Sequence, residues 1–484
     1  MNHNINKSSW HQRIVLILII TLIVFIAGCS FQSTFDYPEI SYIDKSNVIS
    51  KTPEQATFPT ISTGTLKVAL PLSDECLRYL SLIYVGKTQG LLKEDISDNN
   101  GLNVSLEMLD SFETGLNVVL QPVSSTGITD QELQALSLSN ALPDIMLISD
   151  KNKLSSNQIT MAKFDNSTIT QYISPDNIFP SMIQNGLSRS SLLSLPYYAA
   201  VKMLYANDLV TTDVSNNSLL PASSRIDFVT MQTIAKKITN PQTGTYGFMG
   251  LSEMLAFLPM TFESSVSGYM WNGVRYDFSN KAFSNSITNL KTLISSGCVV
   301  DSLNSNQKKV QYNEIDPRIL NKIGFWIDDS NQLESWKLLG QSKIKRYPIQ
   351  GESQITIPLT IYSVVVNSNC LLIDDAKRFA SFLALDKDAL LFRSRYINPN
   401  GFIPPLRDKS IWENLVNTQL QGNEMFSLYE NMDLAKSVTN FDDNTIKTKY
   451  EQLYNEYFND VLYGRKSLPT FLEEINTEAN TAIS

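Results

Sequence analysis

The sequence predicts an α/β protein, because segments with the patterns of strands and of helices alternate along most of its length. Its 43% of hydrophobic and 18% of charged residues provide enough apolar side chains for a folded core, and its 484 residues allow about three domains. Both histidines, His3 and His11, precede a long apolar run. If that run is removed on export, the remaining chain has no imidazole, which excludes Ser-His-Asp and Cys-His catalysis and His-ligated zinc.

The N-terminus predicts a signal for export. Lys7 and Arg13 lie before an apolar run over residues 14–26, which is shorter than the ~20 residues of a membrane-spanning helix. Residues 26–29, Ile-Ala-Gly-Cys, resemble a bacterial lipobox. In a lipobox the signal is cleaved before the cysteine, and a lipid is attached to the thiol of that cysteine. We therefore expect Cys29 to be lipidated, with an uncleaved anchor helix as the alternative.

Cleavage at this point makes residues 1–28 a lipoprotein signal peptide and residues 29–62, rich in Ser, Thr and Pro, a flexible tether. The net charge of −9 becomes more negative without the signal, and such a chain has no basic stripe for a nucleic acid. An anionic membrane does not attract an acidic chain, so the lipid must hold it there. Three further cysteines are expected to be buried free thiols, with one incidental disulfide as the alternative: Cys76, Cys298 and Cys370.

The first part of the body alternates regularly between the two patterns. Strands are expected at residues 65–70, 117–123 and 144–148. Helices are expected after a cap at Ser73 or Asp74, at about 103–113, and from the Thr129–Glu132 capping box to Pro143. This order is typical of a lobe with a largely parallel sheet.

The second part is less regular. Short strands are expected at residues 201–205, 323–327 and 361–366. Helices are expected at 280–296 with Gly297 as C-cap, after a cap at Asp374, and before Gly464, with Ser467 capping the last helix. The helix before Gly464 has an apolar series that consists of Ile446, Tyr450, Leu453, Tyr457 and Val461.

Seven short segments carry a family resemblance through their order along the chain. They begin at Leu142-Pro-Asp-Ile-Met, Ser194-Leu-Pro-Tyr-Tyr, Asn240-Pro-Gln-Thr-Gly-Thr-Tyr-Gly-Phe, Asp277-Phe-Ser-Asn, Asp375-Ala-Lys-Arg-Phe, Asn400-Gly-Phe-Ile-Pro and Val461-Leu-Tyr-Gly. Together they resemble segments of the extracellular solute-binding proteins of ABC importers, in particular the sugar-binding group, family 1. The stretch before Thr129 matches that pattern less well.

The resemblance implies a type II periplasmic-binding fold, with two α/β lobes, a hinge and a ligand cleft between the lobes. The lobes are expected to comprise residues 63–197 with 355–399, and residues 198–354 with 400–484. The chain is expected to cross between them near 196–200, 350–356 and 398–402. Prolines and glycines at or beside these crossings support the placement, because such residues set or absorb backbone angles at hinges.

A sugar site needs aromatic faces for C–H surfaces and polar side chains for hydroxyls. Candidates lie near expected crossings, strand ends and one polar loop: Tyr197, Tyr198, Trp271, Asn272, Asp328 with Asp329, Tyr362, Asp74 and Glu75. The alternatives are structural, namely packing at the hinge for the tyrosines, a solvated turn for the aspartates and helix capping for Asp74 and Glu75. Trp326 is expected in the core.

The predicted function is capture of a small solute, a sugar or oligosaccharide, by hinge closure and its delivery to an ABC permease. The protein is expected to be a monomer, lipid-anchored on the extracytoplasmic face of the cell membrane, with no cofactor, no metal and no nucleic-acid partner. It is not expected to be an enzyme, since no phosphate-cradling motif is present, although a carboxylate pair of a glycoside hydrolase stays open. The alternatives are a surface lipoprotein that acts as a sensor or interaction module, and a non-sugar ligand such as a peptide or polyamine.

Overall fold

The computed structural model describes most of the body of the chain. The described residues are 61–92, 97–98, 101–102, 104, 106–112, 115–149, 159–188, 191–272, 274–340, 343–351, 354–394, 402–415, 424–437 and 444–481. The predicted signal peptide, Cys29 and all but the end of the predicted tether lie outside them, as do residues 398–401 of the third predicted crossing.

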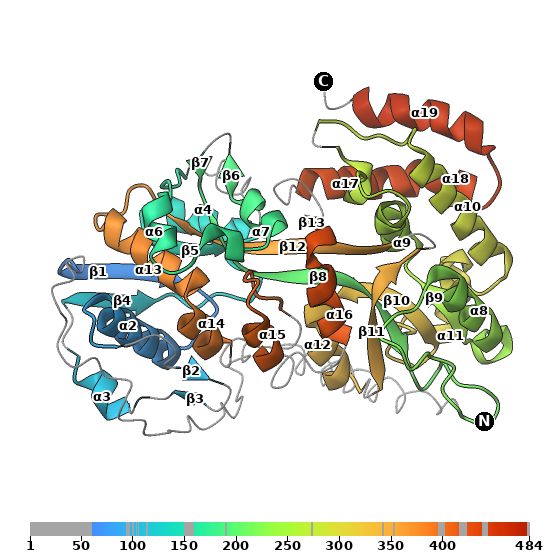
Figure 1. Ribbon diagram of the computed structural model, residues 1–484. Helices are drawn as coiled ribbons and strands as arrows, with labels where there is room; N and C mark the ends of the chain where they lie inside the picture. The colour runs from blue at the N-terminus through green and yellow to red at the C-terminus, as the bar shows by residue number, and fades with distance from the viewer. Residues whose placement is uncertain are drawn as a thin grey trace, which may run out of the picture. The chain divides into compact units, whose positions relative to one another are not determined.

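Nine strands in the described part of the chain form one mixed sheet (Figure 1). They are β1 (Gly64–Ala69), β4 (Leu116–Leu120), β5 (Ile145–Ile148), β8 (Leu195–Asn207), β9 (Tyr246–Met249), β10 (Ile323–Asp329), β11 (Ile344–Gln350), β12 (Ile355–Val366) and β13 (Ala435–Ser437). Their order is β4-β1-β5-β12-β11-β8-β10-β9, and β13 pairs with β12. Two short hairpins are separate from this sheet: β2 (Ser97–Asp98) with β3 (Gly101–Leu102), and β6 (Leu187–Ser188) with β7 (Ser191–Leu192).

The sheet is parallel in its first part, as predicted. β1 pairs in parallel with β4 and β5, whereas β12 runs antiparallel to β5 and β8. β8 is antiparallel to β10 and β11, and β10 is parallel to β9. Every predicted strand is present, but those predicted at residues 201–205 and 361–366 are parts of the longer β8 and β12.

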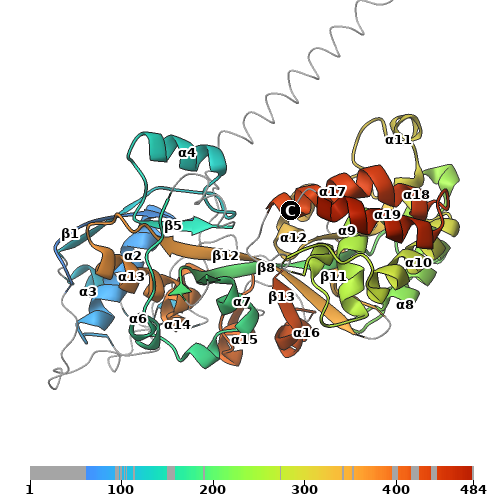
Figure 2. The ribbon, with the colours of Figure 1, turned by 90° about the horizontal axis from the view of Figure 1, so that it is seen from above.

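The helices lie on both faces of the sheet (Figure 1, Figure 2). Those before β8 are α2 (Asp74–Thr88), α3 (Leu106–Asp110), α4 (Asp130–Leu138), α6 (Asn166–Thr170) and α7 (Pro180–Asn185). Those between β8 and β12 are α8 (Phe228–Ile238), α9 (Leu251–Phe257), α10 (Lys281–Ser295), α11 (Ser305–Tyr312) and α12 (Leu333–Leu338). Those after β12 are α13 (Ile373–Leu385), α14 (Lys387–Arg393), α15 (Lys409–Leu415), α16 (Glu424–Asn431), α17 (Asn444–Leu453), α18 (Asn459–Leu462) and α19 (Leu468–Thr481).

Strands β8 and β12 connect the two parts of the sheet. Residues 195–201 of β8 pair with β12, whereas residues 202–207 pair with β10 and β11. β12 in turn begins against β11 and ends against β5. The two strands lie side by side in both views of the ribbon (Figure 1, Figure 2). The first predicted crossing, at residues 196–200, is therefore part of a continuous strand.

Several predicted helix boundaries are confirmed by their caps. Ser73 accepts a hydrogen bond from the Cys76 N–H at 3.1 Å, and Thr129 forms a complete capping box with Glu132. Asn280 caps α10, and Gly297 follows that helix with φ of 71°.

Two predicted boundaries are wrong. The helix predicted at 103–113 is only the five-residue α3. α13 begins at Ile373 without a side-chain cap, because its N-cap residue is Leu372; Asp374 lies inside the first turn and forms an ion pair with Lys377 at 3.1 Å.

The C-terminal helical stretch departs from the predicted single helix. A π-helical turn, Tyr454–Phe458, separates α17 from α18. The wider turn rotates the residues after it relative to those before. Phe458 is therefore fully buried in the core, while Tyr457 is only partly buried against it. The other four positions of the predicted apolar series are buried as expected.

Burial also decides the state of three cysteines. Cys76, Cys298 and Cys370 are buried and free, as predicted. Cys298 belongs to the apolar cluster formed mainly by α8, α9, α10, α17 and β10. These thiols contribute to packing and form no disulfide among the described residues.

One buried cation ties α14 to β8. The Arg393 side chain is fully enclosed and donates hydrogen bonds to the Leu383 O at 2.9 Å and the Tyr197 O at 2.7 Å. Its guanidinium also lies 3.6 Å from the centre of the Tyr197 ring. Burial lowers the pKa of Arg393, with partial compensation from Tyr197.

The close contact between α8 and β9 gives a test of this packing. A Cβ on Gly247 would lie 2.3 Å from the Ala235 O, so Gly247→Ala forces helix and strand apart. We expect a loss of about 2–3 kcal/mol in the free energy of unfolding, measured by urea denaturation. Gly297→Ala is the control, because no atom lies within 4 Å of its Cβ and only its positive φ costs about 1–2 kcal/mol. Equal stability of Gly247→Ala and wild type would contradict this packing.

Candidate functional site

Side chains alternate between the two faces of a strand, and this alternation along β8, β10 and β12 brings one set of side chains to a common face. Tyr198 and Lys202 are four residues apart on β8 and therefore lie on the same side of it. In the β8–β12 pair, Tyr362 lies opposite Tyr198 and Thr360 lies opposite Ala200; in the β8–β10 pair, Asp329 lies opposite Lys202. We call Tyr198, Lys202, Asp329, Thr360 and Tyr362 the crossover face.

The aromatic part of the crossover face is packed. The Tyr198 and Tyr362 rings are 5.3 Å apart, and Phe402 lies 4.2 Å from the first and 5.7 Å from the second. The Tyr198 hydroxyl donates to the Ser125 O at 2.6 Å, which fixes it at the loop that follows the carboxyl end of β4. The two tyrosines are only 3% and 6% exposed, so the three rings cover one another.

The polar part of the crossover face is more open. The Lys202 Nζ lies 2.7 Å from Asp329 Oδ2, and their side chains are 18% and 26% exposed. The same face continues at Leu204 and Ile327 into the apolar core, so the ion pair lies at the margin of that core. Among the described residues, the buried Asp329 Oδ1 has no hydrogen-bond partner. This buried carboxylate oxygen, beside a lysine side chain that is 18% exposed, thus has lone pairs that accept no hydrogen bond.

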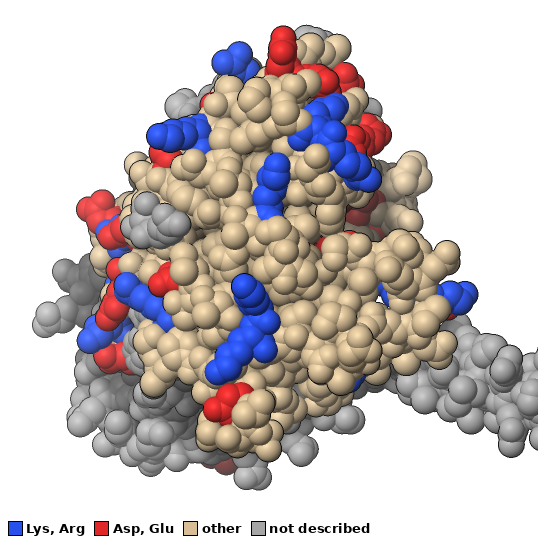
Figure 3. Space-filling model, turned by 90° about the vertical axis from the view of Figure 1, so that its right-hand side faces the viewer, with Lys and Arg blue, Asp and Glu red and all other residues tan. Residues whose placement is uncertain are grey.

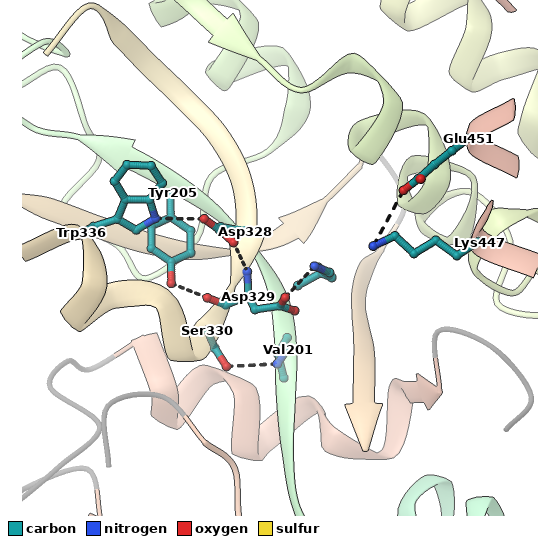
Figure 4. A network of polar contacts seen from close by, with 9 residues as sticks. Val201, Tyr205, Asp328, Asp329, Ser330, Trp336, Lys447 and Glu451 are labelled. Atoms are coloured by element: carbon teal, nitrogen blue, oxygen red, sulfur yellow. Dashed lines mark hydrogen bonds and ion pairs between the residues drawn. The ribbon is translucent and has the colours of Figure 1, made fainter. Parts of the chain in front are cut away.

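Asp328 belongs to the opposite side of β10. Figure 4 shows its carboxylate directed to Trp336, whose Nε1 donates to Oδ2 at 2.9 Å. The neighbouring Tyr205 hydroxyl donates to the Asp329 O at 2.6 Å, and Tyr205 stacks on Trp326 at 5.7 Å. Burial raises the pKa of Asp328, although the hydrogen bonds from Trp336 and from the Asp329 N–H oppose the rise.

The turn after Asp329 is held from two sides. Ser330 Oγ accepts from the Val201 N–H at 3.0 Å, and the Ser330 O accepts from the buried Arg346 at 2.9 Å. The same view shows the Lys447–Glu451 pair of α17, which no marked interaction joins to this network (Figure 4). The acidic turn is therefore rigidly positioned by the backbone of β8 and by a side chain of β11.

The predicted site residues separate into two classes. Tyr198, Tyr362 and the Asp328–Asp329 turn come together around β8, although Asp328 itself faces Trp336. Tyr197 is fully buried beneath Arg393, and burial raises the pKa of its hydroxyl to about 12, so its ring is part of the core. Trp326 is buried, as predicted.

The remaining predicted residues have local roles. Trp271 packs its ring against Tyr276 at 5.2 Å, and Asn272 Oδ1 accepts from two backbone N–H groups of the following turn. Asp74 and Glu75 are exposed in the first turn of α2. Among the described residues, no recorded contact joins any of these four to the crossover face. Their part in ligand binding stays a prediction.

Sequence reasoning missed Lys202, Thr360 and Phe402. Lys202 lies inside a segment recognised as a strand, but its partner Asp329 is 127 positions away. Phe402 reaches the site because Ile403 bridges to Ala199, again a pairing between distant segments. Only the alternation of β8 offered a signal, since it predicts Lys202 on the same side as Tyr198.

The described residues contain no group of three or more His, Cys, Asp or Glu side chains placed to hold a metal. No helix in these ranges has both the length and the apolar character of a membrane span.

On the side of the molecule drawn in Figure 3, basic and acidic side chains are interspersed around a broad uncharged area. The crossover face brings aromatic and polar side chains together on one side of β8 and its neighbouring strands.

The raised pKa of Asp328 predicts a pH-dependent stability. Between the ordinary aspartate pKa and the raised one, the folded chain binds more protons than the unfolded chain, so its stability falls as the pH rises through that window. Asp328→Asn removes this titration. We expect wild type to lose stability relative to Asp328→Asn as the pH rises above about 4, measured by urea unfolding at several pH values. A difference that is constant with pH would refute the assignment.

No family model and no curated protein matches the sequence. Solved structures match most of the chain. An ABC substrate-binding protein from Listeria monocytogenes, in complex with cycloalternan, has a TM-score of 0.59 at 12% identity, with 87% of this chain and 99% of that chain covered. The cyclic α-maltosyl-1,6-maltose binding protein from Arthrobacter globiformis has a TM-score of 0.60 at 14% identity, with 87% and 99% covered.

A third solved structure is described by family. This extracellular solute-binding protein family 1 from Alicyclobacillus acidocaldarius has a TM-score of 0.55 at 14% identity, with 88% of this chain and 100% of that chain covered. At such identities the likeness shows the fold. The chain therefore has the fold of the ABC substrate-binding proteins, and the class predicted from the sequence, α/β with two lobes of the type II periplasmic-binding kind, is confirmed.

Proposed function

We propose that the chain is the substrate-binding protein of an ABC transporter and that it captures a sugar or an oligosaccharide. Two structures with its fold are described with oligosaccharides, one in complex with cycloalternan and one as a binder of cyclic α-maltosyl-1,6-maltose. The proposed lobes, residues 63–197 with 355–399 and 198–354 with 400–484, close around the ligand and present it to a membrane permease. The function is binding and release, without a covalent step.

The crossover face is the observation that carries this proposal. Tyrosine rings match the C–H faces of a sugar, and the Lys202–Asp329 pair beside them provides a donor and, once the buried Asp329 Oδ1 is uncovered, an acceptor for hydroxyl groups. The Tyr198 hydroxyl also places the face next to the carboxyl end of a parallel strand, where open α/β sheets bind ligands. A sugar that reaches the rings has to replace part of the cover that Phe402 provides.

The alternatives have less support. Of the three solved structures reported above, two are described with an oligosaccharide and none as a sensor or interaction module. A peptide or a polyamine has no counterpart among the oligosaccharide ligands of the two structures described above.

The first test of this function is a thermal-shift panel of sugars on the full chain in detergent. A bound sugar at 100 times its dissociation constant stabilises the fold by about 2.7 kcal/mol, which raises the melting temperature by a few degrees. Asp329→Asn is expected to weaken sugar binding by about tenfold, since it removes a charged hydrogen-bond acceptor. Asp316→Asn is the matched control, because its side chain is 27% exposed and paired with Arg318, away from the crossover face.

The panel also includes a peptide mixture and spermidine. Stabilisation by one of these and by no sugar would make the ligand class wrong. Unchanged sugar affinity in Asp329→Asn would move the site away from the crossover face.

We further propose that Cys29 carries the lipid that holds the protein at the membrane. Acyl chains attached to that thiol are expected to provide the anchor. Cys29→Ser should therefore move the protein from the membrane fraction to the soluble fraction and abolish its labelling with palmitate. Cys298→Ser is the control, because Cys298 is buried in the folded core. Retention of Cys29→Ser in the membrane would favour the uncleaved anchor helix.

A further inference from the structure

Strand β13 adds one lysine to the crossover face. β13 pairs in parallel with β12, and Lys436 lies opposite Pro358. Residues paired in register lie on the same face of the sheet. Pro358, Thr360 and Tyr362 are every second residue of β12 and therefore also share one face. Lys436 therefore lies on the same face as the two tyrosines and Lys202. Figure 1 shows β13 alongside β12.

The ammonium of Lys436 is only partly satisfied by the protein. Its Nζ donates to the Val266 O at 3.2 Å, in the loop that leads to Trp271. Within the described ranges it forms no ion pair, and the other two N–H donors have no recorded acceptor. Partial burial lowers the pKa of Lys436, and the negative charge of Glu263 offsets only part of this decrease. The lysine thus bears a cost of desolvation without a bonded carboxylate to offset it.

The neighbouring carboxylates are engaged elsewhere. Asp329 is paired with Lys202 at 2.7 Å, so these two charges balance. The Glu263 carboxylate accepts hydrogen bonds from Ser265 and, at 3.3 Å, from Asn280. The crossover face and Lys436 together therefore carry one positive charge that no bonded carboxylate balances.

We propose that Lys436 is a ligand-binding residue that selects acidic oligosaccharides, those with a sugar carboxylate, over neutral ones. This inference rests on the proposed sugar-binding function and names its substrate class. A carboxylate of the ligand accepts from the two remaining Lys436 N–H donors, while the sugar rings lie against the tyrosines and the hydroxyls reach Asp329. A charged acceptor forms a stronger hydrogen bond to an ammonium than a hydroxyl does, which gives the preference.

The test compares one sugar skeleton with and without its charge. Binding of trigalacturonate and of its fully methyl-esterified form to the full chain in detergent is measured by calorimetry. We expect the acid to bind about tenfold more tightly than the ester, and this ratio to fall to about one in Lys436→Met. Lys309→Met is the control, since Lys309 is exposed on α11 and paired with Glu314.

Two further measurements keep the inference open to refutation if Lys436→Met does not fold. Lys436→Arg retains the charge and should retain the preference for the acid. In wild type the acid-to-ester ratio should decrease between about 20 and 500 mM NaCl, because salt screens the charge. Persistence of the full ratio in folded Lys436→Met, or at high salt, would overturn the role of Lys436.

The outcomes also separate this inference from the proposed function. If neutral sugars bind and the acid has no advantage over its ester, the function stands and the acidic specificity is wrong. If neither acidic nor neutral sugars from the thermal-shift panel bind, the sugar-binding function and this inference both fail.

Discussion

The organisation of the molecule depends on the pairing of one strand. β8 has to match β12 along its first half and both β10 and β11 along its second half. A slip of one residue would exchange its two faces, so Lys202 would enter the packed side and Met203 would take its place at the margin. The Tyr198 hydrogen bond to Ser125, the Arg393 contacts to Tyr197 and the Ser330 bond to Val201 all hold this register.

The same constraint explains why the site has a packed and an open part. Aromatic rings of the crossover face lie where β8 meets β12 and Phe402, and they are almost fully covered. The Lys202–Asp329 pair lies where β8 meets β10, at the edge of the apolar cluster that contains Leu204 and Ile327, and stays partly exposed. The partly exposed polar pair on this face of β8 thus lies between the packed aromatic rings and the apolar cluster.

Local patterns were sufficient to predict most elements but not their partners. The Thr129 capping box, the apolar face of α10 and the strand at Ile323 depend on neighbouring residues and were predictable. The π-helical turn was not, because one extra residue in a turn leaves the apolar spacing before it unchanged. The site was predictable only in part, since Lys202 with Asp329 and Lys436 with Pro358 meet through strand pairing across large separations in sequence.

The three buried cysteines have a consequence for a chain that is proposed to work outside the cell. Burial raises the pKa of Cys370 to about 12 and raises those of Cys76 and Cys298 as well. Oxidation and thiol–disulfide exchange proceed through the thiolate, and a high pKa with little solvent access leaves almost none of it. The body of the protein can therefore keep reduced thiols in an oxidising compartment, without a crosslink to itself or to a neighbour and without an enzyme to maintain them.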